Sequence, residues 1–267
     1  MLFEPTETAY DLRWRMFGIP VRVHPMFWLM TLLMGQSALR GGIEYLLAWV
    51  GCVFVSILIH ELGHVVVGRH FGAFGRIVLY SFGGLAIGSN QLRNWKQRVA
   101  VSFAGPAAGF LFLGALLGLL FVVNRPLYGY GVISMAAYLP IPGDLLRMLV
   151  ARDDAAAAFQ EPPFALMIVG DLVYINLMWG IMNLLPVWPL DGGQICREIC
   201  VRINSFNGVR TSLMISLAVS GLFAAFCIVA HLNPALRLPF GSVYTAIFFG
   251  IFAFQSWQLL QQDRRFR

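Results

Sequence analysis

Long apolar runs constrain the fold of this chain more than any other feature of its sequence. Six apolar segments can be marked, at about residues 26–39, 45–68, 99–123, 164–185, 211–231 and 243–260. A helix that crosses the hydrocarbon core of a bilayer needs about 20 apolar residues, and all but the first segment approach that length. Only 12% of the residues are charged and the mean hydropathy is +0.72, too apolar a composition for a soluble domain. We therefore predict an all-α polytopic membrane protein with about six transmembrane helices.

The basic residues are distributed unevenly between the two sides of the predicted membrane domain. Fourteen of the 19 lysines and arginines fall on the side that holds the N-terminus, and five fall on the opposite side. Basic loop residues concentrate on the cytoplasmic side of membrane proteins, so we expect both termini in the cytoplasm. These residues are scattered through short loops, so membrane topology explains the net charge of +6 better than a nucleic-acid partner does.

The rest of the sequence favours a single membrane-embedded domain over residues 1–267. We find no repeat, no linker and nothing like a PDZ or CBS module. The first apolar segment, 26–39, is short for a span, since 14 helical residues cover about 21 Å, so it is expected to cross with little tilt or to enter only in part. Within the longest loop, about 124–163, residues 143–150 are expected to form a short amphipathic helix. The four cysteines predict neither a disulfide nor a cysteine-ligated zinc site.

The sequence HELGH, residues 60–64, lies within the second apolar segment. Residues i and i+4 share a helix face, so His60 and His64 can point at one metal ion, and neutral imidazole suits zinc. Glu61 lies about 100° round the helix, where a carboxylate can act as general base on a water molecule. Such a trio can occur by chance in a soluble helix, but ionisable groups inside a span are costly and usually mark function.

A catalytic zinc site needs a third protein ligand and an open position for water. Asp171 lies near the outer end of the fourth apolar segment, on the opposite side from His64, and is interpreted as an interfacial residue. Asp191 follows the same segment in NLLPVWPLDGG, where Pro186 and Pro189 interrupt the helix. Broken backbone at membrane depth is tolerated where it lines a cavity. Asp191 is therefore the favoured candidate for the third ligand.

Two asparagines precede this broken segment on one face of the predicted helix. Asn176 and Asn183 are seven residues, or about two turns, apart. We expect Asn176 to form a hydrogen bond between helices. Asn183 lies nearer to Asp191, and its side-chain amide could donate to an oxyanion that develops during a reaction.

Together these segments resemble the site-2 protease family, the zinc metalloproteases that cleave proteins within membranes. The resemblance rests on HELGH, NLLPVWPLDGG, SFGGLAIG at 81–88 and FAGPAAGF at 103–110, and it covers about residues 45–200. It implies a catalytic core there, flanked by the remaining apolar segments. It also implies that His60, His64 and Asp191 bind Zn²⁺, that Glu61 activates water, and that Asn183 positions the substrate or stabilises the tetrahedral intermediate.

The resemblance gives a role to the residues that follow the second span. RIVLYSFGGLAIG, residues 76–88, is expected to form a β-hairpin near the active site, since two apolar runs flank a glycine turn. Its edge, including Gly83, Gly84 and Leu85, would capture an unwound substrate by strand addition, and an ordinary interfacial turn is the alternative. FAGPAAGF is expected to serve close helix packing through its small residues.

The resulting hypothesis is an intramembrane zinc metalloprotease that hydrolyses peptide bonds in or near transmembrane segments, close to the cytoplasmic face. The expected partners are the lipid bilayer and single-span protein substrates, such as an anti-sigma factor or a membrane-tethered regulator. A membrane zinc transporter would place ligands at several depths, whereas the candidates here gather at one. A non-catalytic pseudoprotease scaffold would have no need of Glu61. These two functions are the alternatives.

Overall fold

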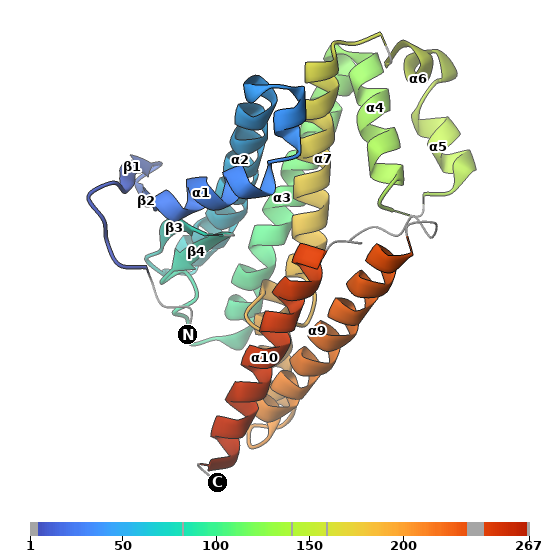
Figure 1. The fold of residues 1–267 in the computed structure, drawn as a ribbon. Helices are drawn as coiled ribbons and strands as arrows, with labels where there is room; N and C mark the ends of the chain where they lie inside the picture. The colour runs from blue at the N-terminus through green and yellow to red at the C-terminus, as the bar shows by residue number, and fades with distance from the viewer. Residues whose placement is uncertain (1–4, 82, 140, 159, 234–242, 266–267) are drawn as a thin grey trace. The chain divides into compact units, whose positions relative to one another are not determined.

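A computed structural model gives the fold of residues 5–81, 83–139, 141–158, 160–233 and 243–265 (Figure 1). Phe82 in the predicted hairpin, and Arg237 and Arg267 among the counted basic residues, lie outside this range. Within it, five helices are long and apolar enough to cross a membrane: α2 (Ile43–His70), α3 (Trp95–Val123), α7 (Pro163–Asn183), α9 (Gly208–Leu232) and α10 (Val243–Arg265). They correspond to the last five apolar segments, which confirms the multi-pass membrane fold.

The first apolar segment forms a helix of only ten residues, α1 (Pro25–Met34). Its length of about 15 Å is half the thickness of a bilayer core, so α1 cannot span. The ring Nδ1 of His24 accepts a hydrogen bond from the Met26 N–H at 3.1 Å and begins the helix, with Pro25 in its first turn. Figure 1 shows α1 running across α2, to which the short 3₁₀ turn η1 (Ala38–Gly41) connects it.

A four-stranded sheet packs against α2. Its strands are β1 (Leu12–Met16), β2 (Ile19–Val23), β3 (Arg76–Tyr80) and β4 (Gly83–Ile87), in the order β1-β2-β3-β4. The outer pairs are antiparallel hairpins, whereas β2 and β3 run parallel because α1 and α2 connect them. The hairpin expected at residues 76–88 is therefore present as β3–β4. The partner hairpin β1–β2 was not predicted, because its two short strands carry three arginines in a segment that reads as a polar N-terminal tail.

One face of the sheet is apolar and buried, and the opposite face carries both buried and exposed side chains. Side chains alternate along a strand, so one set of residues points to the same core as the apolar face of α2. This set has 2% exposure or less and comprises Ile19, Val21, Val23, Ile77 and Leu79. The opposite face carries the arginines of β1, β2 and β3. The sheet is thus fixed to α2 by its apolar face.

The chain divides into two compact units, which are described separately. The first contains residues up to Leu92 and residues 104–181. It includes the sheet, α1, α2, most of α3, α7 and the region 124–163. That region was expected to be mostly loop, but it contains α4 (Arg125–Ala136), α5 (Gly143–Leu149) and α6 (Arg152–Ala158). Helix α5 is the short helix predicted at 143–150.

The second unit contains residues 93–103 and 182–267, and its described helices are the start of α3, α8 (Asp191–Ile203), α9 and α10. Helices α9 and α10 lie side by side as an antiparallel pair (Figure 1). Phe249 and Phe252 of α10 pack with Val187, which lies in the segment between α7 and α8. Arg98 of α3 forms an ion pair with Glu198 of α8 at 2.5 Å.

The N-terminal segment is held against the sheet by a buried carboxylate. Asp11 accepts hydrogen bonds from the Thr8 N–H at 3.2 Å and the Thr8 hydroxyl at 2.6 Å, and its carboxylate lies 3.4 Å from the Arg22 guanidinium. Burial disfavours the charged form of Asp11, but the bonds from Thr8 and the charge of Arg22 outweigh it. The pKa of the Asp11 carboxyl is therefore lowered from its ordinary value of 3.8.

A group whose pKa is lowered by folding stabilises the fold above its unfolded pKa and loses that effect as the pH falls. We therefore expect Asp11→Asn to lower the Tm near neutral pH, and the difference from wild type to shrink as the pH falls below 3.8. Thermal unfolding of the detergent-purified protein across this range measures it. Glu7→Gln, which changes a carboxylate that is 68% exposed, serves as the control. A difference that stays constant with pH would contradict the role of Asp11.

Candidate functional site

Helix α2 presents two histidines and a glutamate within the first unit. His60, Glu61 and His64 are buried, with 4%, 5% and 6% exposure. The i, i+4 spacing places the two rings on one face, and their Nε2 atoms lie 3.2 Å apart. The rings meet edge to face, with centroids 4.9 Å apart. Two imidazole nitrogens of this span-length helix are thus directed at one point beside it.

This pair of nitrogens fits a zinc ion. Tetrahedral coordination with Zn–N distances of about 2.0–2.1 Å separates two ligand nitrogens by roughly 3.3 Å. The observed Nε2–Nε2 distance of 3.2 Å matches that value. Space for the ion is also present, because a Cβ built on Gly105 would lie 2.2 Å from the His64 Nε2 and 2.7 Å from the His60 Nε2. Only a glycine at position 105 leaves that space open.

Helix α3 reaches this position because small residues line its approach to α2. A Cβ on Gly63 would lie 2.3 Å from the Ala104 carbonyl oxygen and 2.7 Å from the Ala108 Cβ. The helices therefore touch through their backbones at Gly63. This confirms the packing role predicted for FAGPAAGF. The prediction missed Gly105, which lies in the same motif and faces the histidines.

The β3–β4 hairpin lies directly beside Glu61. A Cβ on Gly84 of β4 would lie 2.3 Å from the Glu61 Cγ and 2.6 Å from its Oε1. A Cβ on Gly83 would lie 3.2 Å from the Trp179 ring of α7. The predicted hairpin thus brings its glycines to the candidate base, with Leu85 as the next residue of β4. Strand β4 is also at the edge of the sheet, because its ladder neighbour among the described strands is β3 alone.

Asn176 has the structural role that its sequence position predicted. Its side-chain Nδ2 donates to the Ser56 hydroxyl of α2 at 2.9 Å and to the Leu172 carbonyl at 2.8 Å. Both Asn176 and Ser56 are buried, at 3% and 2% exposure. This hydrogen bond links α7 to α2 one turn before the histidine motif.

In the second unit, Asp191 begins α8 immediately after the broken segment. Helix α7 ends at Asn183 and α8 starts at Asp191, so the prolines interrupt the helix as predicted. Asp191 and Asn183 are buried, at 7% and 8% exposure. The first turn of a helix favours a carboxylate electrostatically, which lowers the cost of burying Asp191. A Cβ on Gly192 would lie 2.1 Å from the Leu184 carbonyl oxygen, so the segment folds tightly back onto the start of α8.

Two serines from α9 and α10 hold the broken segment. The Trp188 N–H donates to the Ser216 hydroxyl of α9 at 2.8 Å, and that hydroxyl lies 2.7 Å from the Ser256 hydroxyl of α10. Ser216 and Ser256 are 1% and 0% exposed. A backbone N–H freed by a helix break needs a partner at membrane depth, and this chain of hydroxyls supplies it. No pattern in the sequence pointed to these serines, which lie 28 and 68 residues after Trp188.

Comparison with known proteins gives one family match and several similar proteins. Residues 48–226 match the family described as "Peptidase family M50". The chain is 30% identical over 261 residues to the Synechocystis protein named "Putative zinc metalloprotease sll0528", covering 92% of this chain and 56% of that protein. It is 26% identical over 193 residues to "Zinc metalloprotease MJ0392" of Methanocaldococcus jannaschii, covering 71% and 45%.

Two further similarities concern a sporulation protein and a solved structure. "Stage IV sporulation protein FB" of Bacillus subtilis is 26% identical over 185 residues, covering 68% of this chain and 48% of that protein. The structure "Site-2 Protease from Methanocaldococcus jannaschii" superposes with a TM-score of 0.54 at 23% identity, covering 94% of this chain and 95% of that one. This likeness shows the fold. The chain spans about half the length of the curated relatives it matches.

The space in front of the histidines gives one prediction. Gly105→Ala would place a methyl group where a metal ion fits, so we expect zinc affinity to fall roughly tenfold or more. Gly114→Ala is the matched control, because a Cβ at this position of the same helix meets nothing within 4 Å. Metal content measured by mass spectrometry after dialysis against graded chelator compares the two. Equal zinc retention by both variants would contradict the assignment of this space.

The serine chain gives a second prediction. Ser216→Ala removes the acceptor of a buried N–H, so we expect a loss of about 1–3 kcal/mol in the free energy of unfolding. Ser220→Ala is the control, since the Ser220 hydroxyl donates to the Ser216 and Leu217 carbonyls within the same helix. Equilibrium unfolding in detergent measures both. A loss no larger for Ser216→Ala than for Ser220→Ala would refute this anchoring role.

Proposed function

The chain belongs to peptidase family M50, and we propose that it is an intramembrane zinc metalloprotease that hydrolyses peptide bonds in or near transmembrane segments. One observation carries this proposal. Two histidine nitrogens at ligand spacing and an adjacent glutamate are buried together in a span-length helix, with a glycine-lined space in front of the nitrogens. The family and the curated relatives named zinc metalloproteases support the same reaction.

We propose His60, His64 and Asp191 as the ligands of Zn²⁺. All three are buried residues of a type that binds metal ions, each offering one ligand atom. Two imidazoles and one carboxylate form a donor set found in catalytic zinc sites, where the fourth position stays open for water or substrate. When bound, zinc supplies polarisation of the scissile carbonyl and lowers the pKa of a water molecule.

Two side chains are proposed to act on the reacting groups, Glu61 and Asn183. Glu61 takes a proton from the attacking water, whose oxygen forms a bond to the scissile carbonyl carbon. The same carboxyl then gives that proton to the leaving nitrogen as the C–N bond breaks, so Glu61 is regenerated. Asn183 is proposed to donate a hydrogen bond to the oxyanion of the tetrahedral intermediate, an effect that exists mainly in the transition state.

Strand β4 is proposed to hold the substrate in an extended form. The backbone amides of a helical substrate are shielded, so the helix must unwind before it is cut. The edge of β4 offers backbone hydrogen-bonding groups to an added strand, and Gly83, Gly84 and Leu85 carry them past Glu61. The contact of Gly84 with Glu61 supports this role. Register along β4 would then set which peptide bond meets the base.

The setting of the reaction follows from the membrane topology. We propose that both termini and the site lie on the cytoplasmic side, because basic residues concentrate in the loops there. The substrate class that fits is a single-span membrane protein, such as an anti-sigma factor or another membrane-tethered regulator. Residues 45–200 would then form the catalytic core of one membrane-embedded domain, with α9 and α10 as its support.

The decisive experiment separates metal binding from catalysis. We expect Glu61→Gln to keep its zinc and to lose cleavage of a transmembrane model substrate by at least about 100-fold, because the general base is gone. Asp191→Ala is expected to lose both zinc and cleavage. Glu44→Gln is the matched control, since this acid lies in the first turn of the same helix. Zinc content and gel-based cleavage in detergent are the measurements.

Each alternative function has its own outcome in this experiment. Cleavage by Glu61→Gln at the wild-type rate would remove Glu61 from the mechanism. Unchanged zinc affinity in Asp191→Ala would remove Asp191 from the ligand set. Zinc flux into liposomes that does not depend on Glu61 would indicate a transporter, and substrate binding without cleavage by the wild type would indicate a scaffold.

A further inference from the structure

The turn between β1 and β2 exposes an aromatic ring on a strained backbone. Phe17 and Gly18 are the two residues between the paired Met16 and Ile19, and their φ angles are +51° and +71°. Two positive φ angles are typical of a type I′ turn, which favours Asn-Gly or Gly-Gly because a bulky side chain is strained there. The Phe17 residue is 86% exposed, so packing against the described part of the protein does not offset this strain.

A second exposed ring lies in the connection between α2 and β3. Phe74 is 92% exposed, whereas its two neighbours in the chain, Ala73 and Gly75, are buried. A Cβ on Gly75 would lie 3.1 Å from a methyl group of Val65 in α2, so the connection passes close to the helix. The connection therefore directs one aromatic ring outward from a backbone that is held against α2.

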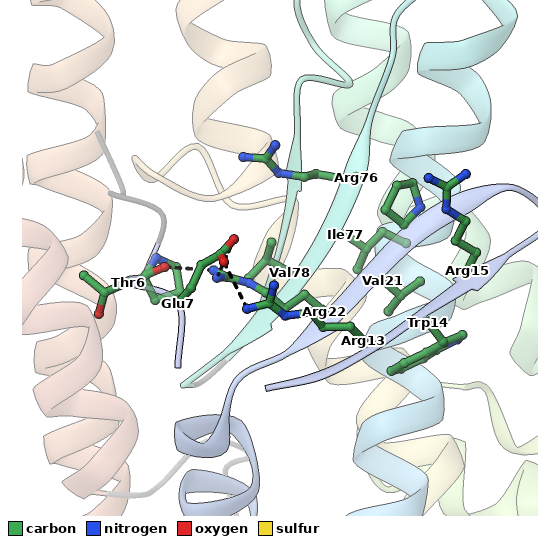
Figure 2. A pocket seen from close by; sticks show the side chains of 12 residues that line it. Thr6, Glu7, Arg13, Trp14, Arg15, Val21, Arg22, Arg76, Ile77 and Val78 are labelled. Atoms are coloured by element: carbon green, nitrogen blue, oxygen red, sulfur yellow. Dashed lines mark hydrogen bonds and ion pairs between the residues drawn. The ribbon is translucent and has the colours of Figure 1, made fainter. Parts of the chain in front are cut away.

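The two rings lie at the same end of the sheet. Strands β2 and β3 are parallel, and Val21 of β2 lies beside Ile77 of β3 (Figure 2). Phe17 is four residues before Val21, and Phe74 is three residues before Ile77. Parallel strands begin at the same end of their ladder, so the turn and the connection are neighbours. We call Phe17 and Phe74 the aromatic tip.

The aromatic tip is attached to the end of a span-length helix. Arg69, in the last turn of α2, donates hydrogen bonds to the Gly18 carbonyl at 2.8 Å and the Phe17 carbonyl at 3.4 Å. Val66 lies one turn earlier on the same helix face and is 56% exposed. The 28 residues of α2 extend about 42 Å, beyond a hydrocarbon core of about 30 Å. The exposed face of this span therefore continues into the tip.

We propose that the aromatic tip inserts into the membrane–water interface, with both rings at the boundary between the lipid headgroups and the acyl chains. Moving an exposed apolar ring from water into this layer is favourable, and that gain would offset the strain at Phe17. Lipid is the partner that the position favours, because the tip continues the exposed face of a span. Such an anchor would fix the depth of the sheet in the membrane. The proposal does not depend on the protease activity.

The first experiment identifies what the rings touch. The full chain is reconstituted in vesicles of phosphatidylcholine and phosphatidylglycerol, with the photo-crosslinker p-benzoylphenylalanine in place of Phe17, Phe74 or Tyr10. Tyr10 is the matched control, because it is 83% exposed and precedes β1, at the opposite end of that strand from Phe17. After irradiation, intact-mass spectrometry should show phospholipid adducts at Phe17 and Phe74 with roughly ten times the yield at Tyr10.

The second experiment measures what the rings do for the hairpin. Phe17→Asn/Phe74→Asn removes both rings, and Asn suits the turn conformation of position 17 better than Phe does. If the rings had no contact with lipid, amide exchange over residues 12–23 would be slower or unchanged. Membrane insertion predicts roughly tenfold faster exchange in the same vesicles, because the hairpin loses its anchor. Phe17→Trp/Phe74→Trp keeps interfacial rings and should exchange as the wild type does.

The remaining outcomes overturn the proposal. Crosslinks that double the protein mass, in place of lipid adducts, would assign the aromatic tip to an interface between two copies of the chain. Lipid adducts that are missing at both rings, or that form equally at Tyr10, would show that the tip does not insert. Exchange in the Asn variant that is no faster than in the wild type would show that the rings do not anchor the hairpin.

Discussion

The burial of two histidines and a glutamate inside an apolar helix is the constraint on which the first unit depends. Polar groups at membrane depth are costly unless the surrounding structure gives them partners or a function. Three glycines let neighbouring segments come close to these side chains. Gly105 leaves space before the ring nitrogens, and Gly63 lets α3 pack against α2. Gly84 brings β4 next to Glu61. A side chain at Gly63 would push α3 away from α2, and side chains at Gly105 and Gly84 would clash with the histidine rings and with Glu61.

The second unit also buries an ionisable group, the Asp191 carboxylate. Asp191 is presented by a segment that the prolines keep out of helical form, and such a segment exposes backbone groups that lipid cannot satisfy. The Ser216 hydroxyl accepts one of them, and the Phe249 ring packs on Val187 of the same segment. Helices α9 and α10 thus have a structural role. They hold the segment that leads into Asp191, although neither contains a residue of the proposed reaction.

The sheet connects the N-terminal hairpin to the candidate site. Its apolar face packs on α2, and its strand β4 lies beside Glu61. The parallel pairing of β2 with β3 joins the N-terminal hairpin to the β3–β4 hairpin, so the proposed substrate strand belongs to a four-stranded ladder.

The membrane fold and the chemistry proposed for the site could both be predicted from the sequence. An apolar run of about 20 residues indicates a span, because that length crosses the hydrocarbon core. Ionisable groups within such a run indicate function, because burying them in the bilayer is costly. Spacing alone placed His60 and His64 on one helix face, and the prolines located the break before Asp191. Three features became visible only in the folded structure: the β1–β2 hairpin, the position of Gly105 and the anchoring by Ser216. These depend on contacts between residues far apart in the chain, and a single glycine or serine looks the same in a sequence whether or not it has such a contact.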